Sequence, residues 1–181
     1  MPITSNQTTN VKLGVCQVFL GGQDLGFTKG GVEVQVETES HVVTVDQLGS
    51  TPISEYITGR SCVVRVPLAE TTLDHLQAIM PDSTLTGTGA TRYATVNSGV
   101  GTELRGIAAV LRLHPKSKLL TDKTEDFVVP LAATTGALTF SYKLDEERVY
   151  NVEFKAYADN NGKLFYVGPV GINDTTGVIT P

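Results

Sequence analysis

Alternation of apolar and polar residues is clearest between residues 32 and 45. Three valines alternate with acidic or amide side chains over residues 32–37, which predicts a strand with one buried face and one mostly acidic face. Beyond His41 the apolar positions change parity to Val43 and Val45. Because successive side chains of a strand point to opposite faces, we predict a bulge or bend near residues 39–41.

The segment that follows has no periodicity. Gly49, Pro52 and Gly59 interrupt it, and it is longer than a hairpin needs, so we predict a loop over residues 46–60. Loops of this length are usually functional or disordered. An apolar run, Cys62–Val66, predicts the next strand.

A helix is predicted over residues 68–80. Pro67 suits a helix start, Glu70 suits the positive end of the helix dipole, and Pro81 prevents continuation. Apolar residues recur at helical spacing, namely Ala69, Leu73, Leu76 and Met80.

The rest of the chain reads as strands separated by turns. Strands are expected over residues 11–20, 104–114, 127–131, 138–143, 150–156 and 164–167, with a short one near 93–96. About eight strands and one helix predict a mainly β fold, a β-sandwich or barrel with one flanking helix. We divide the chain into an N-terminal arm (1–10), one domain (11–168) and a C-terminal arm (169–181).

Composition narrows the function classes. Charged residues make up 18% of the chain and the net charge is −5, which argues against a basic nucleic-acid footprint. No apolar run reaches membrane-spanning length, and residues 1–10 lack a signal-peptide pattern, so we expect synthesis in a cytoplasm. Cys16 and Cys62 are expected to be buried free thiols, and a disulfide between them remains open.

Patterns that could indicate catalysis or metal binding are incomplete. His41 and Asp46 lie near several serines without a nucleophile-elbow pattern, and His75 and His114 lack partners at metal-ligand spacing. Residues 87–92 start like a dinucleotide fingerprint but lack its third glycine, and residues 159–162 fit a hairpin turn better than a calcium loop. We therefore predict no enzyme activity, no cofactor and no metal site.

Acidic residues gather on one face of the first long strand. Glu33, Glu37 and Glu39 share that face with Gln35. One interpretation is an ordinary solvated strand face. The other is the wall of a passage for a polyanion, because a lining without basic groups makes no phosphate contacts and lets DNA slide.

Five groups of residues follow one another along nearly the whole chain. They are Thr28-Lys29-Gly30-Gly31-Val32; Val43-Thr44-Val45-Asp46-Gln47-Leu48-Gly49-Ser50-Thr51-Pro52-Ile53; Gly59-Arg60 with Val66-Pro67-Leu68-Ala69-Glu70; Leu113-His114-Pro115 with Thr124-Glu125-Asp126; and Phe154-Lys155-Ala156-Tyr157-Ala158-Asp159 with Gly162-Lys163-Leu164-Phe165 and Gly168. In this order they resemble the tail tube proteins of long-tailed bacteriophages.

That resemblance implies a structural subunit of the virion tail, assembled in the host cytoplasm. Six-membered rings would stack into a hollow tube through the long loop and the terminal arms, and viral DNA would pass without specific binding. Tape-measure, tail-terminator and distal tail proteins are the implied partners. The stacking residues would include Asp46, Gln47, Gly49, Pro52, Ile53 and Gly59, and the candidate lumen residues are Glu33, Glu37 and Glu39.

Two alternatives stay open at this point. One is the related tube of a contractile secretion system, which shares the architecture. The other is a carbohydrate-binding β-sandwich, which would need exposed aromatic residues on a concave face. The chain contains no Trp, and most of its Tyr and Phe residues fall in strand patterns that predict core positions.

Overall fold

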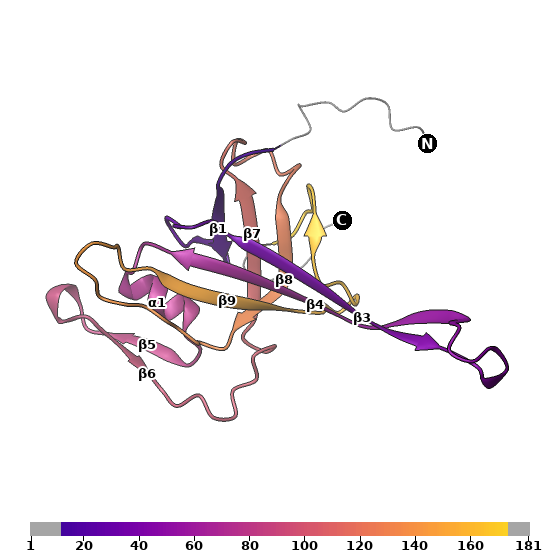
Figure 1. Cartoon of the computed structure of the whole chain (residues 1–181). Helices are drawn as coiled ribbons and strands as arrows, with labels where there is room; N and C mark the ends of the chain where they lie inside the picture. The colour runs from indigo at the N-terminus through magenta and orange to yellow at the C-terminus, as the bar shows by residue number, and fades with distance from the viewer. Residues whose placement is uncertain (1–11, 174–181) are drawn as a thin grey trace.

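The computed structural model describes residues 12–173 and consists mainly of one antiparallel eight-stranded sheet (Figure 1). The strand order is β2-β1-β7-β8-β9-β4-β3, with β10 pairing β8. The strands are β1 (Cys16–Leu20), β2 (Gln23–Asp24), β3 (Glu33–Val43), β4 (Ser54–Leu68), β7 (Ala109–Pro115), β8 (Phe127–Thr134), β9 (Tyr150–Tyr157) and β10 (Tyr166–Val167). A two-stranded hairpin, β5 (Ser83–Thr86) and β6 (Tyr93–Val96), and one helix, α1 (Leu73–Ile79), complete the described fold.

The sheet curves around one hydrophobic core. Val18 from β1 and Leu111 from β7 lie in the same buried cluster as Val64 from β4 and Phe154 from β9. In Figure 1, β7 and β8 cross steeply over the direction of β4 and β9, so the two halves of the sheet enclose these side chains. The predicted mainly β class with one helix is therefore confirmed.

Strand β7 is buried on both faces. Leu111 and Leu113 face the main core, whereas Val110 contacts a second cluster with Val128 and Ile172. The segment after β10 thus covers the other face of β7 and β8. The part of the predicted C-terminal arm that the structure describes, residues 169–173, packs on the body, while residues 174–181 and the arm at 1–10 lie outside the described residues.

Several predicted boundaries are wrong, and the strand predicted over residues 11–20 begins only at Cys16. The predicted loop over residues 46–60 is shorter, because residues 54–60 continue β4, and the predicted helix over 68–80 begins only at Leu73. Pro67 lies inside β4, opposite Asn151 of β9. Backbone pairing with β9 extends the strand past the expected helix start, and the helix begins where Thr72 Oγ1 accepts a hydrogen bond from His75 N at 3.2 Å.

Three other strand predictions need correction. Residues 138–143 do not form a strand, apart from an isolated bridge between Thr139 and Asn151. Residues 104–108 precede β7 as turns, and β5 was not expected at all. The short β10 pairs with β8 instead of returning along β9.

The bulge prediction is confirmed. The register between β3 and β4 shifts between Glu39 and Ser40, where Glu39 pairs with Gly59 and Ser40 with Ile57. Thr58 is therefore the extra residue, and the bulge lies on β4. Both cysteines are free; Cys62 is buried, Cys16 is half-buried, and burial raises the pKa of each thiol.

Candidate assembly surface

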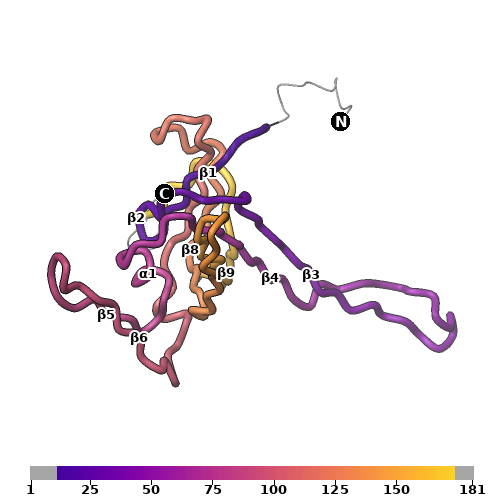
Figure 2. The backbone as a smooth tube through the Cα atoms, turned by 60° about the vertical axis from the view of Figure 1, so that its left-hand side comes forward, coloured from indigo at the N-terminus to yellow at the C-terminus, as the bar shows by residue number. Residues whose placement is uncertain are grey.

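A long β-hairpin projects from the body of the molecule (Figures 1 and 2). Strand β9 pairs with β4 only from Val63 onward, so residues 38–60 have no neighbouring strand except each other. We call residues 38–60 the arm. Every side chain of β3 before Val43, apart from Gln35, is exposed, so the prediction of a half-buried strand is wrong. Val34 and Val36 face the core side but lie at the open end of the sheet and remain 37% and 43% exposed.

The tip of the arm closes through local backbone bonds. Ile53 N donates to Val43 O at 2.9 Å, which ends the ladder between the two strands. Residues Asp46–Leu48 form a 3₁₀ turn, and Gly49 N donates to Asp46 O at 3.3 Å. Gly49 has φ of 60°, a left-handed conformation that favours glycine at this corner.

The arm exposes apolar side chains on both of its faces. Tyr56 and Ile57 are 63% and 64% exposed, and they lie on opposite faces because they are neighbours in β4. Val42, Leu48 and Ile53 add further exposed apolar surface. A two-stranded ribbon that exposes apolar residues on both sides is unusual for a monomer, and exposed apolar patches are typical of protein contact surfaces.

The predicted stacking residues are only partly brought together. Four of them, Asp46, Gln47, Gly49 and Pro52, lie in the connection at the tip, and Ile53 closes it. Gly59 lies in β4 at the bulge, at the root of the arm. A β-carbon there would lie 3.4 Å from Glu39 Oε2, which is an ordinary van der Waals distance.

The predicted acidic row lies on one face of β3, as the alternation requires. Arg65 Nη1 donates to Gln35 Oε1 at 2.6 Å and lies 3.4 Å from Glu33 Oε2, and Gln35 Nε2 donates to Glu37 Oε1 at 2.7 Å. Arg65 Nε also lies 3.4 Å from Glu153 Oε2 on β9. This face therefore carries four carboxylates with Glu39, against Arg65 and Lys155, and remains weakly acidic.

A buried ionic cluster was not predicted from the sequence. Asp126 accepts hydrogen bonds from Arg112 Nη1 at 3.0 Å and from His114 Nδ1 at 2.6 Å, and all three side chains are at most 5% exposed. The available signal was the alternation of Arg112 and His114 within an apolar strand, which places both on one face. The cluster joins β7 to the loop that leads into β8.

A second unpredicted cluster surrounds Arg148. Its guanidinium lies 5.3–5.9 Å from the ring centres of Phe140, Tyr142 and Tyr150, and Nη1 donates to Tyr142 Oη at 3.0 Å. Nε and Nη2 donate to Thr71 Oγ1 at 3.1 and 2.6 Å. These contacts fix residues 138–143 beside the body.

No protein-family model matches the chain, and no curated protein matches it significantly. Within residues 12–173, no helix is long and apolar enough to cross a membrane. In the same range, no three His, Cys, Asp or Glu side chains are grouped so that they could hold a metal ion.

Proposed function

We propose that this protein is a structural, non-catalytic subunit of a phage tail tube, in which rings of subunits stack into a hollow conduit for viral DNA. The arm is the observation that carries the proposal. It holds exposed apolar residues on both faces and has few contacts with the body, which suits a segment that becomes buried against other subunits.

The open edge of the sheet supports the same proposal. Strand β3 has 11 residues and pairs on one side only among the described residues, while the opposite end of the sheet is the two-residue strand β2. Long open edges invite pairing with another chain, and a closed ring removes them. The order of motifs that resembles tail tube proteins, with the host-cytoplasm assembly and virion location it implies, points the same way.

The proposal is tested by negative-stain electron microscopy of the purified protein across a concentration series. We expect hollow rods or rings with a regular axial repeat above a critical concentration, because each subunit carries its own contact surfaces. A protein that stays monomeric and is also absent from purified virion tails would overturn the proposal.

A deletion variant tests the role of the arm. Deletion of Ser50–Ser54 removes much of the connection at the tip and leaves the body unchanged. We expect a folded monomer, by circular dichroism, that forms no rods. Normal rods from this variant would exclude the tip from the stacking contact.

A further inference from the structure

Residues 138–143 have the sequence of a strand but no strand partner. Leu138, Phe140 and Tyr142 alternate with Thr139, Ser141 and Lys143, yet the only pairing in the described chain is the bridge from Thr139 to Asn151. Within residues 12–173, the backbone groups of residues 140–143 form no hydrogen bond. We call this stretch the unpaired segment.

The unpaired segment is nevertheless held in place. Its side chains contact Arg148, which is itself anchored to Thr71 beside the helix. Tyr142 stays 80% exposed, and the following Leu144 is fully exposed. An ordered stretch with free backbone groups and exposed apolar residues is prepared for binding, because little conformational entropy remains to be lost.

Strand direction allows the unpaired segment to meet β3. The segment runs antiparallel to β9 through the Thr139–Asn151 bridge, β9 runs antiparallel to β4, and β4 runs antiparallel to β3. The segment is therefore antiparallel to β3. Thr139 O points toward β9, so the N–H and C=O groups of Phe140 and Tyr142 face the outside of the sheet.

Charge distinguishes two candidate partners of the β3 edge, namely a second β3 edge and the unpaired segment. Antiparallel pairing of two β3 edges would bring Glu33, Glu37 and Glu39 of both copies close together, and like charges across strands are destabilising. The unpaired segment contains no carboxylate, and its Lys143 Nζ donates to Glu146 Oε2 of the same chain at 2.6 Å. A second copy of β3 is thus disfavoured, whereas the unpaired segment itself brings no like charge to the acidic edge.

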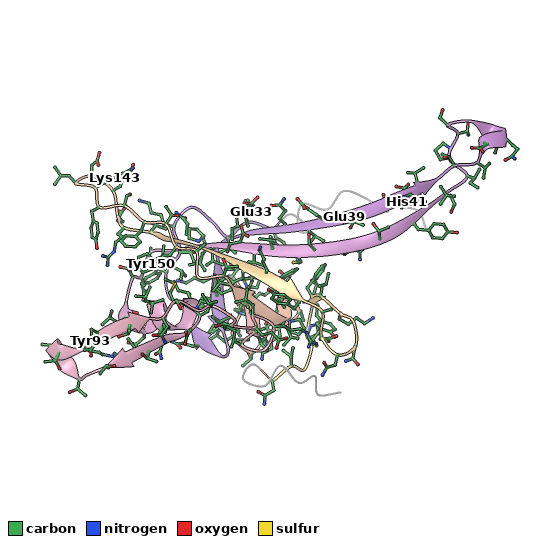
Figure 3. All side chains as sticks on the ribbon, turned by 90° about the horizontal axis from the view of Figure 1, so that it is seen from below. Glu33, Glu39, His41, Tyr93, Lys143 and Tyr150 are labelled. Carbon is green, nitrogen blue, oxygen red and sulfur yellow. The ribbon has the colours of Figure 1, made fainter. Side chains whose placement is uncertain are left out.

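The two edges lie toward opposite ends of the molecule. In Figure 3, Glu39 and His41 point one way along the sheet from Glu33, and Lys143 lies at the other end. One molecule cannot pair them with each other, so the contact joins copies that are offset along the strand direction. Such a contact is heterologous and continues from copy to copy.

We propose that the β3 edge of one subunit binds the unpaired segment of a second copy by antiparallel strand addition. This inference rests on the proposed self-assembly and names the surfaces that perform it.

Hydrogen exchange of the full-length protein, measured by mass spectrometry on monomer and on rods, tests the pairing. We expect peptides covering 33–43 and 138–143 to exchange at least about tenfold more slowly in rods, because a broken strand pair must precede exchange. Rods in which residues 138–143 exchange at the monomer rate would overturn this inference alone. A protein that stays monomeric and is also absent from purified virion tails would overturn the proposed function together with this inference.

A matched pair of variants isolates the backbone contribution. Tyr142→Ala removes the ring and keeps the N–H, whereas Tyr142→Pro removes the N–H as well. One hydrogen bond fewer per contact predicts a critical concentration about threefold to tenfold higher for Tyr142→Pro than for Tyr142→Ala. Equal critical concentrations for two folded variants would contradict the pairing, and exchange rates in β7 establish that each variant is folded.

Discussion

Asp126 is the residue on which the buried part of β7 depends. It is the carboxylate between two cationic or potentially cationic side chains, Arg112 and His114, and all three are removed from water. Its backbone also takes part in the contact, because Gly168 N donates to Asp126 O at 2.9 Å and brings the C-terminal segment against the sheet. Asp126 therefore contacts both β7, through its side chain, and the C-terminal segment, through its backbone.

Asp126→Asn should destabilise the monomer strongly. The substitution keeps the shape but removes the carboxylate that Arg112 and His114 both contact, and removing one partner of a buried ion pair costs about 3–5 kcal/mol. Urea unfolding of the monomer measures the loss. Asp145→Asn, at an exposed position, is the control and should change the unfolding free energy by less than about 0.5 kcal/mol. A similar small effect for Asp126→Asn would show that the cluster contributes little to stability.

At the scale of elements, the arm and the body are nearly independent. The two strands of the arm pair only with each other, because β9 pairs with β4 only from Val63 onward. The side chains of β3 in the arm are largely exposed. A two-stranded hairpin is marginally stable alone, so it contributes little to the stability of the domain that carries it. Its length is better explained by contacts outside the monomer.

Replacing residues 40–58 by Asn-Gly should preserve the body. The new two-residue turn would join Glu39 to Gly59, which already face each other. We expect the unfolding free energy to change by no more than about 1 kcal/mol, since few buried contacts are removed and the closed loop becomes shorter. Urea unfolding checks this expectation. A loss of about 3 kcal/mol or more would mean that the arm supports the fold.

The sequence predicted the composition of the fold better than its boundaries. Strand patterns in the sequence correctly indicated β1, β9 and the main parts of β4, β7 and β8, and the parity change correctly indicated the position of the bulge. The helix start was wrong because Pro67 suits both a helix and a strand, and pairing with Asn151 decided between them. Long-range pairing of this kind cannot be read from local patterns.

In the candidate site, too, local features could be predicted from the sequence and features that depend on long-range pairing could not. The common face of Glu33, Glu37 and Glu39 followed from alternation, whereas the extent of the arm depended on where β9 stops pairing with β4. The prediction of a strand at 138–143 was wrong for the monomer because alternation reports suitability for pairing and says nothing of whether a partner is present. The unpaired segment is the stretch where the sequence pattern predicts a strand and the monomer provides no partner strand.

At the scale of the whole molecule, the main property is that the two proposed contact surfaces lie at opposite ends. In Figure 3, Glu39 and His41 of the arm and Lys143 of the unpaired segment lie toward opposite ends, so identical copies can join head to tail. The net charge of −5 adds a general repulsion toward nucleic acid. Both properties suit the conduit proposed above.

Charge reversal at two positions tests which face lines the lumen. We expect wild-type rods to leave short duplex DNA open to nuclease, because an acidic wall makes no phosphate contacts. Rods of the Glu37→Lys, Glu39→Lys double variant should retain duplex DNA at low salt and protect it from digestion. Glu33 is left unchanged because it pairs with Arg65.

Protection from nuclease distinguishes DNA held inside a rod from DNA bound to its outer surface. DNA that binds the variant rods but remains fully digestible would place these side chains on the outer surface. That result would contradict the lumen assignment and leave the tube itself standing.

The single extra residue at Thr58 has a mechanical consequence. The arm extends about ten residues beyond the body, or roughly 33 Å at the usual rise of a strand. A rotation of about 10° at its root would therefore move the tip by roughly 6 Å, comparable to a whole side chain. We expect the bulge, with its local bend and twist, to set the direction in which the arm leaves the body. That direction would in turn set the angle between successive layers of the proposed assembly. Tubes of different helical pitch could then arise from substitutions beside Thr58, with every residue at the contacting tip unchanged.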